Sequence, residues 1–420
     1  MSIVDASEDE IMDWNIKDDV RLREKHQFGE VFTPDFLITE LLTHIPPSVW
    51  RNPDTKWLDP AAGDGRFGAM VYLKLFKTLS NVIPNIQQRK RHILENMLFM
   101  VELNPEHVKT LQHRFGKKNV ISGDFIQQQQ QQQPQYTVIL GNPPYQASRS
   151  ETLYAGSQGK RTLWDKFIKH SLSLLEPNGY LAFLTPAGWR RPESPLYDLM
   201  TRQHTLRYLH VFGEKVGRDV FGVQTRFDLY VIQNKKMKST ETTTTTIVDE
   251  QGQTHYHFDV STWPFLPNYA YDLIRSILIS KTEKGIPVIF HSNEHDARKL
   301  RRNKTSKYRY PIVHTQTRRG LGILYADHSS TTRSLPKVIL NFNRNLYPYN
   351  DFRGDYGLTQ LSFGLPIQSQ HEGDRLIQAL ECPAFQEIVR ATKWSSFQTD
   401  YRMFKYFHKK RLLHLPSKMV

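Results

Sequence analysis

Apolar residues follow two alternating spacings along the first half of the chain. Helical spacing, with apolar positions three and four residues apart, covers 34–45, 66–79, 105–115 and 164–175. Short apolar runs typical of buried strands lie at 57–59, 97–101, 120–121, 137–140 and 180–184. Because strands alternate with helices, we expect an α/β fold in which a parallel sheet is covered on both faces.

This alternation stops around residues 235–260. A run of glutamines at 127–133 and a run of threonines at 242–246 fall between expected elements, so we interpret both as loop expansions without a catalytic role. Beyond residue 260 the chain mixes aromatic, basic and turn residues, with helical spacing near 372–392. We expect an acidic N-terminal extension at 1–27, a first domain at 28–240 and a C-terminal region at 255–420.

Composition narrows the protein class. No run of 18 apolar residues occurs, which argues against a transmembrane helix, and the acidic N-terminus lacks a secretory signal pattern. Cys382 is the only cysteine, so an intramolecular disulfide is excluded. We expect an intracellular location: the cytoplasm, or the nucleus or a viral factory for a eukaryotic or viral protein. The single cysteine also argues against a cytosine-C5 methyltransferase. Such an enzyme needs a cysteine nucleophile in a characteristic loop, and the sequence around Cys382 is unrelated to that loop.

The net charge of +14 suggests a polyanionic partner. Basic residues concentrate between 298 and 319 without an intervening acid, and Tyr308 and Tyr310 lie among them. Cations contact phosphates and aromatic rings stack on bases, so we expect this segment to bind nucleic acid. The pattern alone leaves a solvated basic loop open. The expected DNA-binding residues are Arg298, Arg301, Arg302, Lys304, Lys307, Arg309, Arg318 and Arg319.

A glycine-rich loop follows the first expected strand. Asp59 ends that strand, and Gly63, Gly65 and Gly68 fit the pattern G-x-G-x-x-G before a helix. Glycines let the backbone approach a ligand closely. A dinucleotide site wants an acid about 20 residues further on, but the acid at the next strand end is Glu102, well beyond that spacing. Since such an acid binds ribose hydroxyls of NAD or S-adenosylmethionine, the loop leaves the cofactor open.

The sequence Asn142-Pro143-Pro144-Tyr145 comes directly after another strand and suggests the chemistry. An exocyclic amine is a poor nucleophile because its lone pair is delocalised into the base. Hydrogen bonds from the amine to the Asn142 side-chain oxygen and the Pro143 carbonyl would localise that lone pair toward a methyl donor. The prolines fix the loop, and Tyr145 offers a ring for a base taken out of its stack.

These motifs resemble the amino-methyltransferases, and more narrowly the gamma-class adenine-N6 DNA methyltransferases of the Eco57I type. The resemblance covers about 28–235 and rests on motifs at 29–34, 59–65, 101–105, 123–125, 142–145, 163–186 and 220–228. It implies a Rossmann-like S-adenosylmethionine-dependent domain followed by a C-terminal target-recognition domain that binds double-stranded DNA. It leaves a companion restriction endonuclease open as a partner.

The resemblance also assigns residues. Glu102 would bind the ribose, Asp124 the amino group of the cofactor, and the motif that ends at Thr33 and Pro34 would close over its methionine end. Phe221 would pack on the flipped base; Phe227 is a nearby alternative. The full cofactor set is Thr33, Pro34, Asp59, Ala61, Gly63, Gly65, Glu102, Asp124, Phe125 and Asn142, and the catalytic set is Asn142, Pro143, Pro144, Tyr145 and Phe221.

Several alternatives stay open. Related catalytic motifs methylate RNA, cytosine N4 or glutamine in release factors, although Asn142 suits adenine better than the serine or aspartate common in cytosine enzymes. A bifunctional restriction–modification polypeptide would have to hide its nuclease in the C-terminal half. A decayed, non-catalytic DNA-binding protein is disfavoured by the intact motifs. No Cys/His cluster has zinc spacing, so we expect no metal.

Overall fold

The computed structural model describes residues 2–12, 33–127, 136–146, 162–235, 244–291, 299–342, 346–394 and 398–416. The chain divides into two compact units. The first comprises residues 1–189 and 195–263, and the second comprises 190–194 and 264–420. Residues 255–263, which we had assigned to the C-terminal region, therefore cluster with the first unit. None of the described helices is both long enough and apolar enough to cross a membrane.

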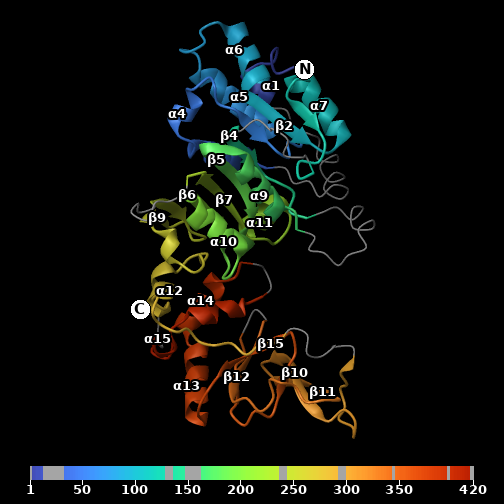
Figure 1. Cartoon of the computed structure of the whole chain (residues 1–420), viewed down its shortest axis with the longest axis vertical. Coiled ribbons are helices and arrows are strands. Elements are labelled where there is room, and N and C mark those ends of the chain that lie inside the picture. The colour runs from blue at the N-terminus through green and yellow to red at the C-terminus, as the bar shows by residue number, and fades with distance from the viewer. Residues whose placement is uncertain are drawn as a thin grey trace. The chain divides into compact units, whose positions relative to one another are not determined.

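Nine described strands form one sheet in the first unit, in the order β3-β2-β1-β4-β5-β7-β6-β8-β9 (Figure 1). The strands β1 to β5 are parallel, and β7 runs antiparallel to both of its neighbours. Their bounds are β1 Trp57–Asp59, β2 Leu98–Glu102, β3 Val120–Ser122, β4 Tyr136–Gly141, β5 Leu175–Pro186, β6 Thr205–Phe212, β7 Phe227–Gln233, β8 Thr245–Val248 and β9 Thr254–Phe258.

The helices of this unit connect and cover the strands. Their bounds are α1 Glu8–Met12, α3 Asp35–Thr43, α4 Pro47–Trp50, α5 Arg66–Thr78, α6 Ile86–His92, α7 Pro105–Phe115, α9 Trp164–Leu174, α10 Pro195–Asp198 and α11 Glu214–Phe221. From β1 the chain passes through α5 and α7 toward β3, whereas α9 leads from β4 in the opposite direction to β5. Because parallel crossovers are right-handed, α9 lies on the face opposite α5 and α7.

The strands β1 and β4 are neighbours in the parallel part of the sheet and are fully buried. Strands buried on both faces consist of continuous apolar runs, and this is why their positions could be predicted from the sequence. The N-terminal residues also contribute to the core: Ile3 is completely buried, and its amide donates to the carbonyl of Arg114. The segment that we had expected to be an acidic extension is thus packed into the first unit at its start.

The second unit contains two small sheets, each of three described strands, in the orders β11-β10-β14 and β13-β12-β15. The strands are β10 Tyr310–Thr317, β11 Gly320–Ala326, β12 Lys337–Asn341, β13 Tyr349–Asp351, β14 Gly357–Leu358 and β15 Ser362–Pro366. The helices are α12 Tyr271–Ile277, α13 Gln370–Glu381, α14 Pro383–Ala391 and α15 Lys409–Leu412. The helical spacing near 372–392 is confirmed as α13 and α14.

Candidate functional site

The predicted motifs meet where the strand order reverses. The chain leaves β1 toward β2 and β3, and it leaves β4 toward β5, so the two central strands part at their carboxyl ends. In open α/β sheets, ligands bind in the crevice beyond such a switch point. Asp59 ends β1, Glu102 ends β2, and Asn142 directly follows β4. The topology thus brings the predicted cofactor loop and catalytic motif to one edge of the sheet.

The three glycines of the cofactor loop differ in what a side chain at each position would contact. Gly65 has a φ of 87° and precedes α5, and a Cβ there would come within 2.7 Å of Leu111 and Phe115. A Cβ at Gly68 would overlap Met100. Gly63 also has a positive φ, of 53°, but a Cβ there would meet open space. Packing therefore constrains Gly65 and Gly68, whereas Gly63 borders the space that a ligand can enter.

Glu102 fixes this loop from the neighbouring strand. Its Oε2 accepts a hydrogen bond of 2.7 Å from the amide of Gly63, and its Oε1 accepts one of 2.7 Å from the amide of Asn104. A carboxylate has about four lone-pair sites, so both oxygens keep the capacity to accept from further donors. Glu102 is thus suited to bind ligand hydroxyls, as the sequence prediction requires.

Asp59 is buried beside the same loop. Its Oδ1 accepts from the amide of Ala61 at 3.2 Å, whereas its buried Oδ2 has no hydrogen-bond partner among the described residues. The pKa of the Asp59 carboxyl is raised to about 8, mainly by burial; the Ala61 amide opposes this shift, and the charges of Glu102 and Asp64 add to it. A ligand that donates a hydrogen bond or carries a positive charge would satisfy this carboxyl.

Asp124 and Phe125 follow β3, one strand further out. The Oδ1 of Asp124 accepts from the amide of Ile126 at 2.8 Å, and the carboxylate keeps further acceptor capacity. Phe125 is buried, with its ring 5.2 Å from that of Phe167 and 4.6 Å from that of His170, centroid to centroid. The acid at this position is half-buried, so an incoming ligand can reach it.

Asn142 is held by the end of the N-terminal motif. Its Nδ2 donates to Oγ1 of Thr33 at 3.1 Å, and Pro34 then caps α3. This bond orients the side chain, and its buried Oδ1 has no partner within the described parts of the chain. Buried acceptors are nearly always hydrogen-bonded in native proteins, so this oxygen could accept from a donor outside the described residues, such as a ligand. Residues 29–32 of the N-terminal motif lie outside the described residues.

Tyr145 and Phe221 lie together beyond Pro143 and Pro144. Their rings meet edge to face at 6.4 Å between centroids, and Phe221 also contacts the ring of Phe227 at 4.8 Å. Phe227 instead stacks within the core on Phe212. Phe221, at the end of α11, is thus the aromatic residue that faces the catalytic loop. Burial raises the pKa of Tyr145 well above its usual value, and the Asp228 charge adds to this effect, so Tyr145 stays a neutral hydroxyl.

One stabilising contact of the site was not predicted. Asp35, in the first turn of α3, accepts a hydrogen bond of 2.6 Å from Nε of Arg66 at the start of α5. This ion pair joins the Thr33–Pro34 segment to the helix that follows the glycine loop. The two residues stand far apart in the sequence and belong to different motifs, so no local pattern could have revealed their pairing.

The predicted DNA-binding residues belong to the second unit. Residues 301, 302, 304, 307, 309, 318 and 319 are all exposed, whereas Arg298 lies outside the described residues. The guanidinium of Arg301 lies 5.1 Å from the Tyr308 ring centroid, and that of Arg309 lies 5.2 Å from the Tyr310 ring centroid. Such cation–π contacts orient the cations without neutralising them. That these residues bind phosphates stays a prediction.

Metal ligands do not gather anywhere in the described ranges: no group of three or more His, Cys, Asp or Glu side chains there could hold an ion. The expectation that no metal takes part stays a prediction.

Comparison with known proteins finds similarity in the first unit. Residues 69–221 match the family model of the Eco57I restriction–modification methylases. An uncharacterised adenine-specific methylase of Mycoplasma pneumoniae is 24% identical over 51% of this chain and 69% of its own length. The matched segment runs from the helix after the glycine loop through the catalytic loop to Phe221.

Among solved structures, the M protein of the type I restriction enzyme EcoKI is similar at 15% identity, with a TM-score of 0.38 over 52% of this chain. A modification subunit of a putative type I restriction enzyme from Vibrio vulnificus is 15% identical, with a TM-score of 0.42 over 58% of this chain. The type IIL restriction–modification enzyme MmeI, solved in complex with DNA, is 10% identical, with a TM-score of 0.49. This match covers 93% of this chain and 68% of the MmeI chain.

The matches to the EcoKI and Vibrio proteins cover about half of each of those chains, 48% and 53%. The family match falls within the first unit, whose sheet has its switch point between β1 and β4 and an antiparallel β7. The first unit has a Rossmann-like fold of the kind found in S-adenosylmethionine-dependent methyltransferases, and its residues 69–221 are similar to the Eco57I restriction–modification methylases.

Proposed function

We propose that this protein is a site-specific DNA methyltransferase that methylates the N6 amine of an adenine flipped out of duplex DNA. The observation that carries this proposal is the buried Oδ1 of Asn142, which lies at the switch point without a partner among the described residues. An acceptor held in place before the substrate arrives is what a poorly nucleophilic amine needs.

The residues around the glycine loop fit S-adenosylmethionine as the cofactor. Glu102 has acceptor capacity for the ribose hydroxyls, and Asp124 has the same capacity for an amino group. Asp59 offers a buried oxygen without a partner among the described residues, and Gly63 leaves open space beside it. When bound, the cofactor supplies an activated methyl group on a sulfonium sulfur.

The residues of the catalytic loop then act on the target amine. The Oδ1 of Asn142 and the carbonyl oxygen of Pro143 accept its two hydrogens, which localises the nitrogen lone pair for attack on the methyl carbon. The amine held by Asn142 and Pro143 would receive the methyl group from the bound cofactor and release one proton to solvent. Because Pro143 and Pro144 restrict the backbone, the two acceptors need little reorganisation.

The aromatic pair would hold the base. Tyr145 and Phe221 touch each other edge to face in the structure, and a base that inserts must turn or separate the two rings. Ring stacking contributes about 1–3 kcal/mol per base, which offsets part of the cost of taking the base out of the duplex. The Tyr145 ring thus provides the platform, while its neutral hydroxyl adds no charge next to the reacting amine.

The test is to identify the methylated product. The purified chain is incubated with S-adenosylmethionine and either duplex DNA, single-stranded DNA, RNA or a cell protein extract, and each product is digested for mass spectrometry. We expect N6-methyladenine, with duplex DNA as the best substrate. Methyl groups on cytosine N4, on RNA alone or on protein glutamine would overturn the substrate assignment. Sequencing of the methylated DNA would give the recognition site, which a companion restriction endonuclease would share.

A further inference from the structure

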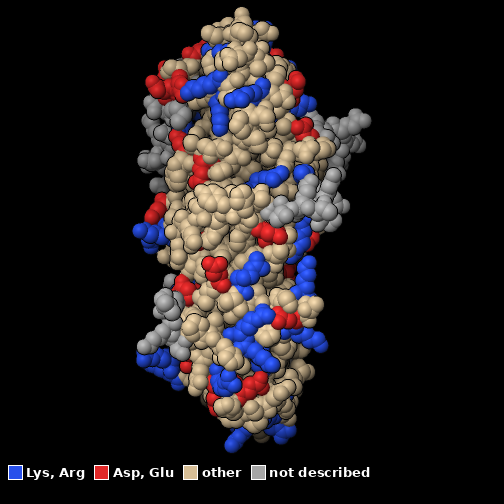
Figure 2. Space-filling view, turned by 90° about the vertical axis from the view of Figure 1, so that its left-hand side faces the viewer, with Lys and Arg blue, Asp and Glu red and all other residues tan. Residues whose placement is uncertain are grey.

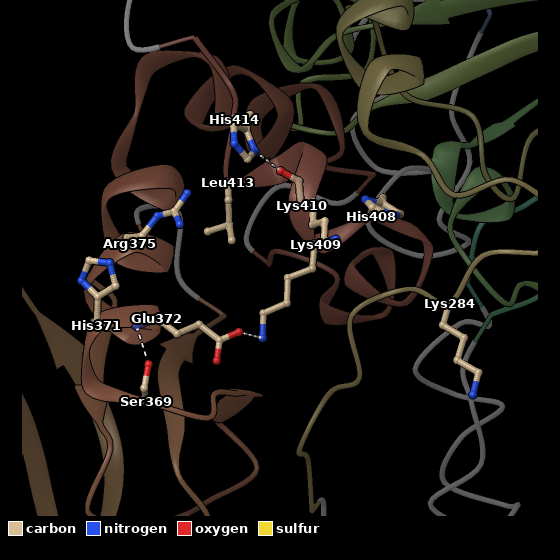
Figure 3. Close-up of a pocket in the computed structure, with 10 residues that line it drawn as sticks. All are labelled: Lys284, Ser369, His371, Glu372, Arg375, His408, Lys409, Lys410, Leu413 and His414. Atoms are coloured by element: carbon tan, nitrogen blue, oxygen red, sulfur yellow. Dashed lines mark hydrogen bonds and ion pairs between the residues drawn. The ribbon is translucent and has the colours of Figure 1, made fainter.

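A cavity of about 560 Å³ lies within the second unit, between Lys284, the start of α13 and the residues of α15 (Figure 3). Four cations, Lys284, Arg375, Lys409 and Lys410, lie in its lining against a single acid, Glu372. Three histidines complete the polar part of the lining: His371, His408 and His414. This cavity has no role in the chemistry described above, and none of its residues belongs to the basic segment at 298–319.

The single acid of the cavity is already neutralised. Its Oε1 lies 2.5 Å from the ammonium of Lys409, the ion pair drawn in Figure 3, and its Oε2 accepts from the amide of Gln368 at 2.6 Å. Partial burial has the largest single effect and tends to raise the pKa of Glu372, but the hydrogen bonds from Lys409 and Gln368 and the Lys409 charge together outweigh it, so the pKa is lowered. Glu372 and Lys409 therefore cancel each other in charge.

The remaining cations give the cavity its positive charge. Arg375 and Lys410 are exposed, and they project from α13 and α15, which lie on different sides of the cavity in Figure 3. Arg375 can form paired hydrogen bonds to an oxyanion, and Lys410 can supply a point charge from the other side. Two cations of this kind, on separate helices around one opening, suit a phosphate group.

The charge of the whole unit indicates where that phosphate comes from. Within 264–420, Lys and Arg outnumber Asp and Glu by about two to one, so most of the net charge of +14 lies in this part of the sequence. On the face drawn in Figure 2, Lys and Arg side chains are also more prominent than acidic ones over the second unit. A broad positive surface with a cationic opening suits a polyanion better than a small metabolite.

We propose that this cavity, with Arg375 and Lys410, binds backbone phosphates of the duplex DNA substrate, as a second contact site separate from the segment at 298–319. The inference rests on the proposed function for its choice of nucleic acid. Phosphate contacts fix the register of a protein on the duplex without reading its sequence. The site therefore contributes affinity and positioning, and base recognition is left to other residues.

The test compares two double variants of the full chain. Arg375→Ala/Lys410→Ala removes two cations of the cavity and leaves Lys284, and Lys281→Ala/Arg353→Ala removes one exposed Lys and one exposed Arg of the same unit outside it. Binding of a fluorescent duplex is measured across a salt series, and thermal melting verifies that each variant is folded. Each lost phosphate contact should reduce the salt slope by about 0.9, so we expect a decrease of roughly two units for the cavity variant alone.

Three results would overturn the proposal: an unchanged slope, an equal decrease in the control variant, or a loss confined to duplex RNA. Calorimetric titration with pyrophosphate tests whether the cavity is a site for a small anion. If the cavity variant loses pyrophosphate binding but keeps DNA binding, DNA is not the ligand. Methyl transfer by the wild-type chain is measured in parallel. If the wild-type chain transfers no methyl group but the salt slope still depends on the cavity residues, the proposed function is overturned and the DNA-binding site is retained.

Discussion

Two buried oxygens at the switch point, Oδ2 of Asp59 and Oδ1 of Asn142, have no hydrogen-bond partner among the described residues. A buried polar atom without a partner costs about 1–3 kcal/mol. Asp59 precedes the glycine loop, in which Gly63 borders open space, and Asn142 belongs to the catalytic loop. A ligand that donates hydrogen bonds to these oxygens would recover this cost.

Removal of the ribose-binding acid should weaken cofactor binding. Glu102→Ala loses an acceptor for the ribose hydroxyls and also releases the Gly63 amide. Since hydrogen bonds to a charged group contribute about 1.5–3 kcal/mol, affinity should fall roughly 10- to 100-fold, and Asp59→Ala should also weaken it. Calorimetry with S-adenosylmethionine is the measurement, with the exposed Glu106→Ala as control. Wild-type affinity in Glu102→Ala would show that the cofactor lies elsewhere.

The raised pKa of Asp59 predicts a pH-dependent stability. The pKa is about 8 in the folded chain against 3.8 for the unperturbed group, so between these values the folded state binds more protons than the unfolded state. Stability is then lost as the pH rises from about 4 through 8. Asp59→Asn removes this loss. Its free energy of unfolding in urea should therefore exceed that of wild type by more at pH 8 than at pH 5. A difference independent of pH would mean that Asp59 is charged when folded.

The ring of Tyr145, more than its hydroxyl, should matter for the target base. Tyr145→Phe keeps the ring and should change single-turnover methyl transfer only a few-fold. Tyr145→Ala also removes the contact with Phe221, and the loss of about 1–3 kcal/mol of stacking should slow transfer roughly 5- to 150-fold. Equal defects in both variants would instead assign the main role to the buried hydroxyl.

At the scale of elements, the central parallel strands could be predicted because they are apolar throughout. The run Val138–Ile139–Leu140 in β4 is an example. The strands β10 and β11 are only partly buried, so no clear alternation marked them, and the second unit gave no recognisable pattern beyond α13 and α14. Ile3 was missed for a related reason, since one buried residue in an acidic segment makes no pattern. The glutamine run from residue 128 lies outside the described residues.

The hairpin of β10 and β11 leads to a prediction about DNA binding. Arg301 pairs with Tyr325 of β11 through backbone hydrogen bonds, which an alanine would keep, while its exposed side chain and that of Arg302 would be lost. Arg301→Ala/Arg302→Ala should weaken duplex binding and reduce the salt slope by about one unit for each lost contact. If affinity stays equal to wild type across the salt series, this segment is only solvated. Loss of sequence preference alone would indicate that an arginine reads a base edge.

At the scale of the whole molecule, the motifs were found in the sequence because each is local, whereas their contacts depend on the fold. The Asn142–Thr33 hydrogen bond and the Asp35–Arg66 pair join segments that no spacing relates. The residues expected to bind the cofactor and the target base belong to the first unit, and most of the net charge belongs to the second. This division agrees with the proposed separation of methyl transfer from DNA recognition.

The most direct measurement is single-turnover methyl transfer to duplex DNA by Asn142→Ala, with the exposed Asn81→Ala as a matched control. The variant loses the side-chain acceptor but keeps the Pro143 carbonyl, so cofactor and DNA should still bind. The loss of one preorganised contact to the reacting group costs about 2.7–4 kcal/mol, which predicts transfer roughly 100- to 1,000-fold slower than wild type, with N6-methyladenine still the product. Transfer by Asn142→Ala at a rate near that of wild type and of Asn81→Ala would contradict the mechanism.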